Sequence, residues 1–314
     1  MRIWQLLLTA TADALRLQMS RSDPMWSLPG QYHTSDAIHK EIVRMPAVCK
    51  RPMTIETIEG IDTVTVGATN STTRAFILFG EHARELVSSE TALSLLRRIC
   101  SGQEGEDVLF KIMPNANPRG RSLVESGETC RRTNPEGIDI NRNWENPRAT
   151  SLRLKNRDME EQTYGGEKAF STIETRTIRD QLVSFKPDLF ISIHSGTFGM
   201  YTPYANDQHK YETVQEQADF SRMKTLVEGV DSETCNCPLG EAVVKVGYSS
   251  WGTCIDWVYQ NLHTPYVYAF EIYTGGSSQE DCFGTFNPSG SSLDEVTRKW
   301  SSAVLKVASL VHPA

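Results

Sequence analysis

The chain has 314 residues, of which 39% are hydrophobic and 23% charged, and its formal net charge at pH 7 is −7. These values are typical of a globular protein, and the negative charge argues against nucleic acid or an anionic membrane surface as its partner. No apolar stretch reaches the roughly 20 residues that a membrane-spanning helix needs.

The first 27 residues differ in character from the rest of the chain. An early arginine is followed by an apolar stretch at residues 3–8 and then by alanines at every second position from residue 10 to residue 14. This pattern resembles a short secretory signal, although a frayed N-terminal helix is the alternative. We therefore expect residues 1–27 to be a leader or flexible arm and residues 28–314 to form one catalytic domain. We also expect the protein to be secreted or to reside in a secretory-pathway compartment.

Short apolar strands alternate with amphipathic helices through the remaining chain. Strands are predicted at residues 74–79, 107–113, 189–193 and 266–273. Helices are predicted at residues 85–98, 171–185, 254–262 and 292–310, the second of them opened by a capping box from Ser171 to Glu174. This alternation predicts an α/β fold whose mixed, mostly parallel twisted sheet carries helices on both faces. In such folds the functional side chains gather where strands end.

The seven cysteines are spread along the chain without the spacing of a zinc finger. Because their number is odd, at least one thiol stays unpaired. Cys235 and Cys237 lie too close in sequence to suggest a bond with each other, so we expect each to need a distant partner.

Two predicted strands end in side chains that can bind a metal ion. The strand at 74–79 runs into Gly80, and His82 and Glu85 follow it. His194 directly follows the strand at 189–193. Imidazole nitrogen and carboxylate oxygen both bind zinc well. Taken singly, however, the first pair also fits the polar start of a helix, and His194 fits a core histidine bonded to a backbone carbonyl.

A third strand carries an acid in its interior. Glu271 lies between Phe270 and Ile272, and burying a carboxylate without a partner costs several kcal/mol. A functional acid near a cation is the favoured interpretation, with a structural ion pair to an arginine as the alternative.

Residues 130–144 are rich in guanidinium and amide groups and poor in apolar side chains. Asn141 and Arg142 could together bind a carboxylate through charge-assisted hydrogen bonds. Asp139 could hold the far nitrogen of a metal-bound histidine. A charged, solvated loop is the alternative for the whole stretch.

Five segments together resemble the zinc metallocarboxypeptidases of the carboxypeptidase A/B type. They are EHAREL, GIDINRNW, ISIHSG, GYSSWGTCIDW and AFEIY, and they occur in that order. The resemblance extends from about Tyr32 to the C-terminus. It implies one catalytic Zn²⁺ ion and the C-termini of peptides or proteins as substrate. We expect a monomer without nucleic-acid or membrane partners.

The resemblance also implies a role for each matching residue at the reaction centre. His82, Glu85 and His194 would bind the zinc ion, leaving a fourth position for water. Glu271 would be the general base and proton shuttle. Arg131, the first of the two arginines after Cys130, would polarise the scissile carbonyl.

Further matching residues imply how the substrate is held. Asn141, Arg142 and Tyr248 would bind the terminal carboxylate, and Arg84 would contact the peptide upstream. Ile255 would form the floor of the pocket for the last side chain. Because this floor is apolar, we expect the enzyme to release aliphatic or aromatic residues.

Some positions depart from the family pattern. Arg119 stands where an acid is usual, and Cys130 and Gly196 stand where aromatic residues are common, so we expect Gly196 to widen the upstream subsite. Trp251 and Thr253 replace small residues beside the pocket and leave its depth open. Little chain precedes the catalytic domain, so we expect activity without the removal of a folded inhibitory domain.

Two other functions remain as alternatives. The same fold could serve a zinc amidohydrolase acting on a non-peptide amide, which would not require a free terminal carboxylate. It could also serve a catalytically inactive binding module, which the complete ligand set and Glu271 argue against.

Overall fold

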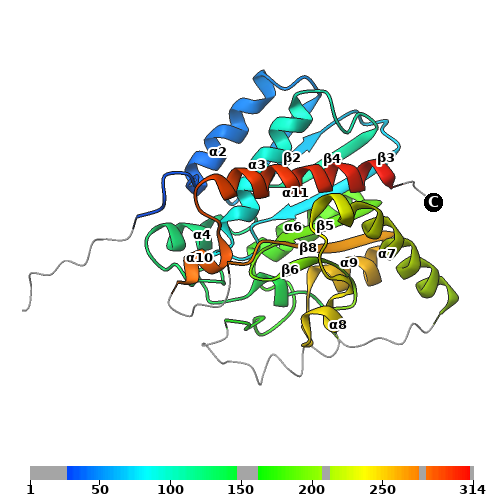
Figure 1. Ribbon diagram of the computed structural model, residues 1–314. Helices are drawn as coiled ribbons and strands as arrows, with labels where there is room; N and C mark the ends of the chain where they lie inside the picture. The colour runs from blue at the N-terminus through cyan, green and yellow to red at the C-terminus, as the bar shows by residue number, and fades with distance from the viewer. Residues whose placement is uncertain (1–26, 147–161, 207–212, 276–280, 312–314) are drawn as a thin grey trace, which may run out of the picture.

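The computed structural model describes residues 27–146, 162–206, 213–275 and 281–311, and Figure 1 shows their arrangement. The leader or arm expected at residues 1–27 lies outside them except for its last residue. One eight-stranded sheet forms the centre, with the strand order β1-β2-β4-β3-β5-β8-β6-β7. The strands are β1 (Met53–Ile58), β2 (Ile61–Val66), β3 (Thr73–Phe79), β4 (Val108–Met113), β5 (Leu189–His194), β6 (Phe198–Thr202), β7 (Leu239–Glu241) and β8 (Tyr266–Ile272).

The four central strands, β4, β3, β5 and β8, are parallel to one another, whereas β1, β2 and β6 pair antiparallel to their inner neighbours. The central strands are almost wholly buried, which requires cover on both faces of the sheet. The prediction of a mixed, mostly parallel sheet is confirmed.

Helices supply that cover. Those of the described residues are α2 (Ser35–Arg44), α3 (Leu86–Cys100), α4 (Pro118–Glu125), α6 (Ile173–Phe185), α7 (Val214–Thr234), α8 (Ala242–Val246), α9 (Cys254–Leu262), α10 (Cys282–Phe286) and α11 (Ser291–Leu310), with 3-10 turns η1 (Met45–Ala47) and η2 (Ile140–Arg142). Helix α11 crosses in front of the sheet in Figure 1, with α3 packed on one side of it and α7 on the other. Helix α9 packs against β5 and β8. No helix among the described residues has the length and apolarity to cross a membrane.

The predicted elements agree with the structure to within two residues at either end. The N-cap of α6, however, was predicted one residue too early. The helix is capped by Thr172, whose side chain accepts a hydrogen bond from the backbone N–H of Thr175. Ser171 instead accepts a hydrogen bond from the side chain of Asn143, so the expected capping box does not form.

The disulfides also differ from expectation. Cys49 bonds to Cys100 and Cys130 to Cys282, which leaves Cys254 as a buried free thiol. Cys235 and Cys237 bond to each other, contrary to the prediction. Asn236 between them takes a left-handed conformation with φ of 49°, which brings the two Cα atoms to 5.0 Å. Asparagine adopts this conformation more readily than most residues, and the linear spacing of the cysteines does not reveal it.

The order of the strands brings the predicted metal ligands together. His82 and Glu85 follow the C-terminal end of β3, and His194 is the last residue of the adjacent strand β5. Glu271 lies directly opposite His194 in the pairing of β5 with β8. The carboxyl ends of three neighbouring parallel strands therefore place these four residues at one edge of the sheet.

A buried ion cluster joins α3 and α4 to the segment before α2. The guanidinium of Arg121 lies 3.4 Å from the carboxylate of Glu90 and 3.2 Å from that of Glu125, and it also donates hydrogen bonds to the backbone oxygens of Leu86 and His33. Arg121 itself is fully buried.

We therefore expect Arg121→Leu to lower the free energy of unfolding by about 3–5 kcal/mol, because two acids would be left without their buried cation. Arg97→Ala is the matched control. It removes an ion pair to Glu41 at the surface and should cost less than about 1 kcal/mol. Denaturant titrations of the three proteins measure both values, and equal losses for the two variants would contradict the assignment.

Candidate active site

The three predicted metal ligands converge on one point. The Nδ1 atoms of His82 and His194 lie 3.1 Å apart, and the carboxylate of Glu85 lies 2.7 Å from the first and 3.1 Å from the second. All three side chains are buried. Burial raises the pKa of Glu85, but the nearby His82 and His194 outweigh this and hold it far below its ordinary value.

The donor set fits a zinc ion. Two imidazole nitrogens and one carboxylate oxygen are a common ligand set for catalytic zinc, and here they face one another within bonding range of a shared ion. The outward Nε2 atom of His82 lies 3.4 Å from the carboxylate of Asp139. The structure thus brings Asp139 to the far side of His82, where the sequence predicted a carboxylate.

Asp139 also connects the metal site to its neighbours. Its carboxylate accepts hydrogen bonds from the Nε of Arg132 at 2.7 Å and from the backbone N–H of Asn141 at 2.9 Å. Burial raises the pKa of Asp139, but the positive charge of Arg132, followed by that of His82, outweighs burial and holds the pKa well below its usual range. The carboxylate therefore stays ionised although it is completely buried.

Glu271 lines the same cavity and pairs with His194 across β5 and β8. Its Oε2 atom is inaccessible to solvent and has no hydrogen-bond partner among the described residues. Burial of the carboxyl, with the negative charge of Glu85 added, raises the pKa of Glu271 to about 7. A carboxyl group in this state can both take up and release a proton near neutral pH.

The arginine pair is placed differently from the prediction. Arg131 points away from the cavity, with its guanidinium bonded to Glu128 and to the backbone oxygens of Asn134 and Pro135. Arg132 lines the cavity instead, 4.0 Å from the carboxylate of Glu85. Adjacent residues of an irregular loop point in different directions, and sequence alignment by motif cannot decide between two consecutive arginines.

The predicted carboxylate-binding residues also reach the cavity. Asn141 and Arg142 lie on η2 and line the same cavity as the metal ligands. The volume of this cavity is about 440 Å³. The guanidinium of Arg142 donates to the backbone oxygen of Asn141 and to the hydroxyl of Ser250. Tyr248 stands at the rim and is 60% exposed.

The remaining predicted residues also line the cavity. Ile255 lines it at the start of α9, where Thr253 is also part of the wall. Arg84 lines it as well, and its guanidinium lies 4.1 Å from the centre of the Phe286 ring. Burial lowers the pKa of Arg84 to about 10, and the positive charge of Arg132 acts in the same direction.

Gly196 does not widen the cavity as expected. A Cβ atom at position 196 would lie 2.4 Å from the ring of Phe286, so that ring already occupies the space that the glycine leaves. Gly196 also has a φ of 120°, which side-chain-bearing residues rarely adopt. The aromatic group of this wall thus comes from α10 rather than from position 196.

Sequence reasoning missed a buried group behind His194. The carboxylate of Glu81 lies 3.1 Å from the Nε2 of His194 and accepts hydrogen bonds from the hydroxyl of Ser192 and the thiol of Cys254. Burial raises the pKa of Glu81, but the hydrogen bond and charge of His194 outweigh it and lower the pKa. Glu81 therefore does for His194 what Asp139 does for His82. Its position directly after a buried strand and next to His82 was the available signal.

Comparison with known proteins agrees with this geometry. The family model described as zinc carboxypeptidase matches residues 48–301, which include all the predicted site residues. A zinc carboxypeptidase of Simulium vittatum is 27% identical over 268 residues, which is 77% of this chain and 86% of the relative. Zinc carboxypeptidase A 1 of Anopheles gambiae is 25% identical, and the match covers 65% of this chain and 49% of that protein.

The fold has matches among solved structures. Bovine thrombin-activatable fibrinolysis inhibitor, solved in complex with tick carboxypeptidase inhibitor, superposes with a TM-score of 0.72 at 20% identity. The superposition covers 89% of this chain and 97% of that chain. Since the family model spans well over half of the sequence, the chain belongs to the zinc carboxypeptidase family.

Proposed function

We propose that the protein is a zinc-dependent metallocarboxypeptidase that removes residues one at a time from the C-terminus of peptides or proteins. The observation that carries this proposal is the convergence of His82, Glu85 and His194 in a cavity that Glu271 and Arg132 also line. When bound there, zinc supplies a Lewis acid that polarises a carbonyl and lowers the pKa of water toward about 7.

The residues of the chain divide the remaining work. Glu271, which lines the cavity together with the metal ligands, takes a proton from the attacking water and returns it to the amine that leaves. Arg132 provides positive charge where negative charge develops on the carbonyl oxygen. Its bond to Asp139 fixes the guanidinium in place before the substrate arrives.

Recognition of a free chain end depends on other residues of the same cavity. Arg142 and Asn141 offer positive charge and an amide to a terminal carboxylate, and Tyr248 can close over it from the rim. An uncharged end would leave the buried Arg142 without a compensating anion from the substrate, which penalises blocked peptides.

The wall around Ile255 supports a preference for apolar terminal residues. Ala205, Ala242 and Ala269 also line the cavity, and its two lining acids, Glu85 and Glu271, are a metal ligand and the proposed general base. Lys245 lines the cavity too and would repel a basic terminal side chain. We infer that aliphatic and aromatic residues are released in preference to arginine or lysine.

The disulfides support an oxidising location. Three such bonds in one chain are typical of proteins that fold in the secretory pathway or outside the cell. We therefore propose that the enzyme is secreted or acts in a secretory compartment. All the residues proposed for the reaction come from a single chain, which supports action as a monomer.

Zinc should stabilise the folded protein through the three ligands. After removal of metal by a chelator, added Zn²⁺ should raise the free energy of unfolding by about 4 kcal/mol at a thousandfold excess over its Kd. His194→Ala should abolish this gain, whereas His39→Ala, at an exposed histidine paired with Asp62, should leave it intact. Thermal unfolding and metal analysis measure the effect, and a gain that persists in His194→Ala would refute the site.

Arg132 and Arg131 give opposite expectations for catalysis. We expect Arg132→Met to lower kcat about 100-fold to 1,000-fold, the usual cost of removing a group that stabilises an oxyanion. Arg131→Met should change kcat by less than about threefold, because Arg131 lies outside the cavity. Steady-state kinetics, with zinc content checked for each variant, compares them. A larger loss for Arg131→Met would restore the assignment made from sequence.

A digest of a peptide library tests both the reaction and the preference. Peptides ending in Phe or Leu should lose their last residue faster than those ending in Arg or Glu, and C-terminally amidated peptides should resist by about 100-fold or more. Glu271→Gln should be inactive while keeping its zinc. Equal cleavage of amidated and free peptides would favour an amidohydrolase, and no cleavage at all with zinc bound would favour an inactive binding module.

A further inference from the structure

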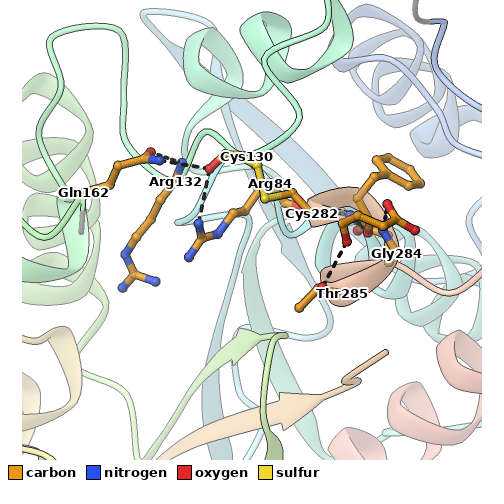
Figure 2. Close-up of a disulfide and its surroundings, with 10 residues drawn as sticks. Arg84, Cys130, Arg132, Gln162, Cys282, Gly284 and Thr285 are labelled. Carbon is orange, nitrogen blue, oxygen red and sulfur yellow. Dashed lines mark hydrogen bonds between the residues drawn. A yellow bond between two sulfur atoms is a disulfide. The ribbon is translucent and has the colours of Figure 1, made fainter. Parts of the chain in front are cut away.

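A disulfide joins two segments that both contribute to the upstream wall of the cavity. Cys130 directly precedes the two arginines, and Cys282 opens helix α10, 152 residues later. Arg132 lines the cavity from the first segment and Phe286 from the second. Figure 2 shows the bond and the groups around it.

The backbone of Cys130 is linked directly to Arg84 and, through Gln162, to Arg132. Its carbonyl oxygen accepts hydrogen bonds from the guanidinium of Arg84 at 3.2 Å and from the side-chain amide of Gln162 at 3.1 Å. Gln162 in turn accepts a hydrogen bond from the backbone N–H of Arg132. In Figure 2 the guanidinium groups of Arg84 and Arg132 extend side by side, away from the disulfide.

The second segment is short and lies at the margin of the core. Helix α10 has five residues, none of them fully buried, and Phe283 packs against the core beside the ring of Tyr32. It is attached to the site at its end, where the backbone oxygen of Phe286 accepts a hydrogen bond from the hydroxyl of Ser195. Asn287 donates to the backbone oxygen of Arg84.

Arg84 and Arg132 depend on the Cys130–Cys282 disulfide to different degrees. Arg132 is held independently by the carboxylate of Asp139. Among the described residues, the contacts of the Arg84 guanidinium are the Cys130 carbonyl and the Phe286 ring, one from each side of the disulfide. Loss of the bond would therefore affect Arg84 more than Arg132.

We propose that the Cys130–Cys282 disulfide positions Arg84 and Phe286 as a rigid wall for the part of the peptide upstream of the scissile bond. The two cysteines are positioning residues, and the bond makes the enzyme favour substrates long enough to reach this wall. The inference rests on the proposed function, because the wall has a substrate only if peptides are cleaved in this cavity.

The test compares two substrates with the same C-terminal residue, a blocked dipeptide and a blocked tetrapeptide. In the Cys130→Ser/Cys282→Ser variant, the ratio of kcat/KM for the long substrate to that for the short one should fall about fivefold through a higher KM for the long substrate. The kcat values should stay close to those of the wild type, because Arg132 and Glu271 remain in place.

The Cys49→Ser/Cys100→Ser variant is the matched control. It removes a disulfide outside the cavity, so it should lower the thermal midpoint but leave the ratio unchanged. If Cys130–Cys282 had a merely structural role, its loss would likewise lower the thermal midpoint, and it would lower kcat/KM by the same factor for both substrates. An unchanged ratio in the Cys130→Ser/Cys282→Ser variant overturns the proposal.

Three further measurements follow, of which the first two do not depend on the folding of that variant. Phe286→Ala keeps the disulfide and should lower the same ratio, and reduction of the folded wild type by a phosphine should do so as well. In combination, Phe286→Ala and the cysteine changes should cost less than the product of their separate effects, since both act on one wall. The proposal is overturned if the effects of Phe286→Ala and of the cysteine changes on the ratio of kcat/KM multiply fully. It is also overturned if neither Phe286→Ala nor phosphine reduction changes that ratio.

Hydrolysis of the two substrates by the wild-type enzyme distinguishes failure of the disulfide's role from failure of the proposed function. Hydrolysis of both substrates with no effect of the disulfide on their ratio refutes only the role of the bond. Hydrolysis of neither substrate refutes the proposed function and this inference with it.

Discussion

The carboxylate of Asp139 is completely buried, yet it stays ionised because three groups of the site surround it. Arg132 and the backbone N–H of Asn141 donate to it, and the imidazole of His82 lies beside it. A buried charge in the protein interior is tolerated only when its partners are held in place, so this one interaction constrains all three segments. The metal site, the guanidinium of Arg132 and the turn that carries Asn141 and Arg142 are positioned together by one carboxylate.

The two histidines are supported in the same way from different directions. Asp139 stands behind His82, and Glu81 stands behind His194. Each carboxylate favours one ring orientation and makes the inward-facing nitrogen a better metal ligand. Three arginines, Arg84, Arg132 and Arg142, line the cavity along with the acids Glu85 and Glu271, so groups of both charges face its interior.

Much of this arrangement could be predicted from sequence, because it depends on local patterns. Strands that end in His194 or lead to His82 are recognisable from apolar runs, and parallel strands in an α/β fold bring such ends to one edge. Glu271 was recognisable because burying a carboxylate in an apolar strand costs free energy unless a cation, a proton or a metal-bound water compensates it. The helix that starts at Cys254 was predicted with its bounds correct.

The errors concern features that depend on the direction of single side chains or on distant partners. Consecutive arginines could not be told apart until the loop that carries them was placed, and Arg132 proved to be the one in the cavity. Phe286 fills the space beside Gly196 from a segment far along the chain. The Cys235–Cys237 bond depends on the left-handed conformation of Asn236, which residue spacing does not encode.

The buried free thiol has a consequence for the chemistry of the three disulfides. Cys254 is sealed in the core beneath the site, where its sulfur points at Glu81 and no solvent reaches it. Thiol exchange requires that a sulfur approach the bond it attacks, so a solvent-excluded thiol cannot scramble the three existing linkages or join two molecules together. The chain can therefore carry an unpaired sulfur through an oxidising environment without becoming a covalent dimer.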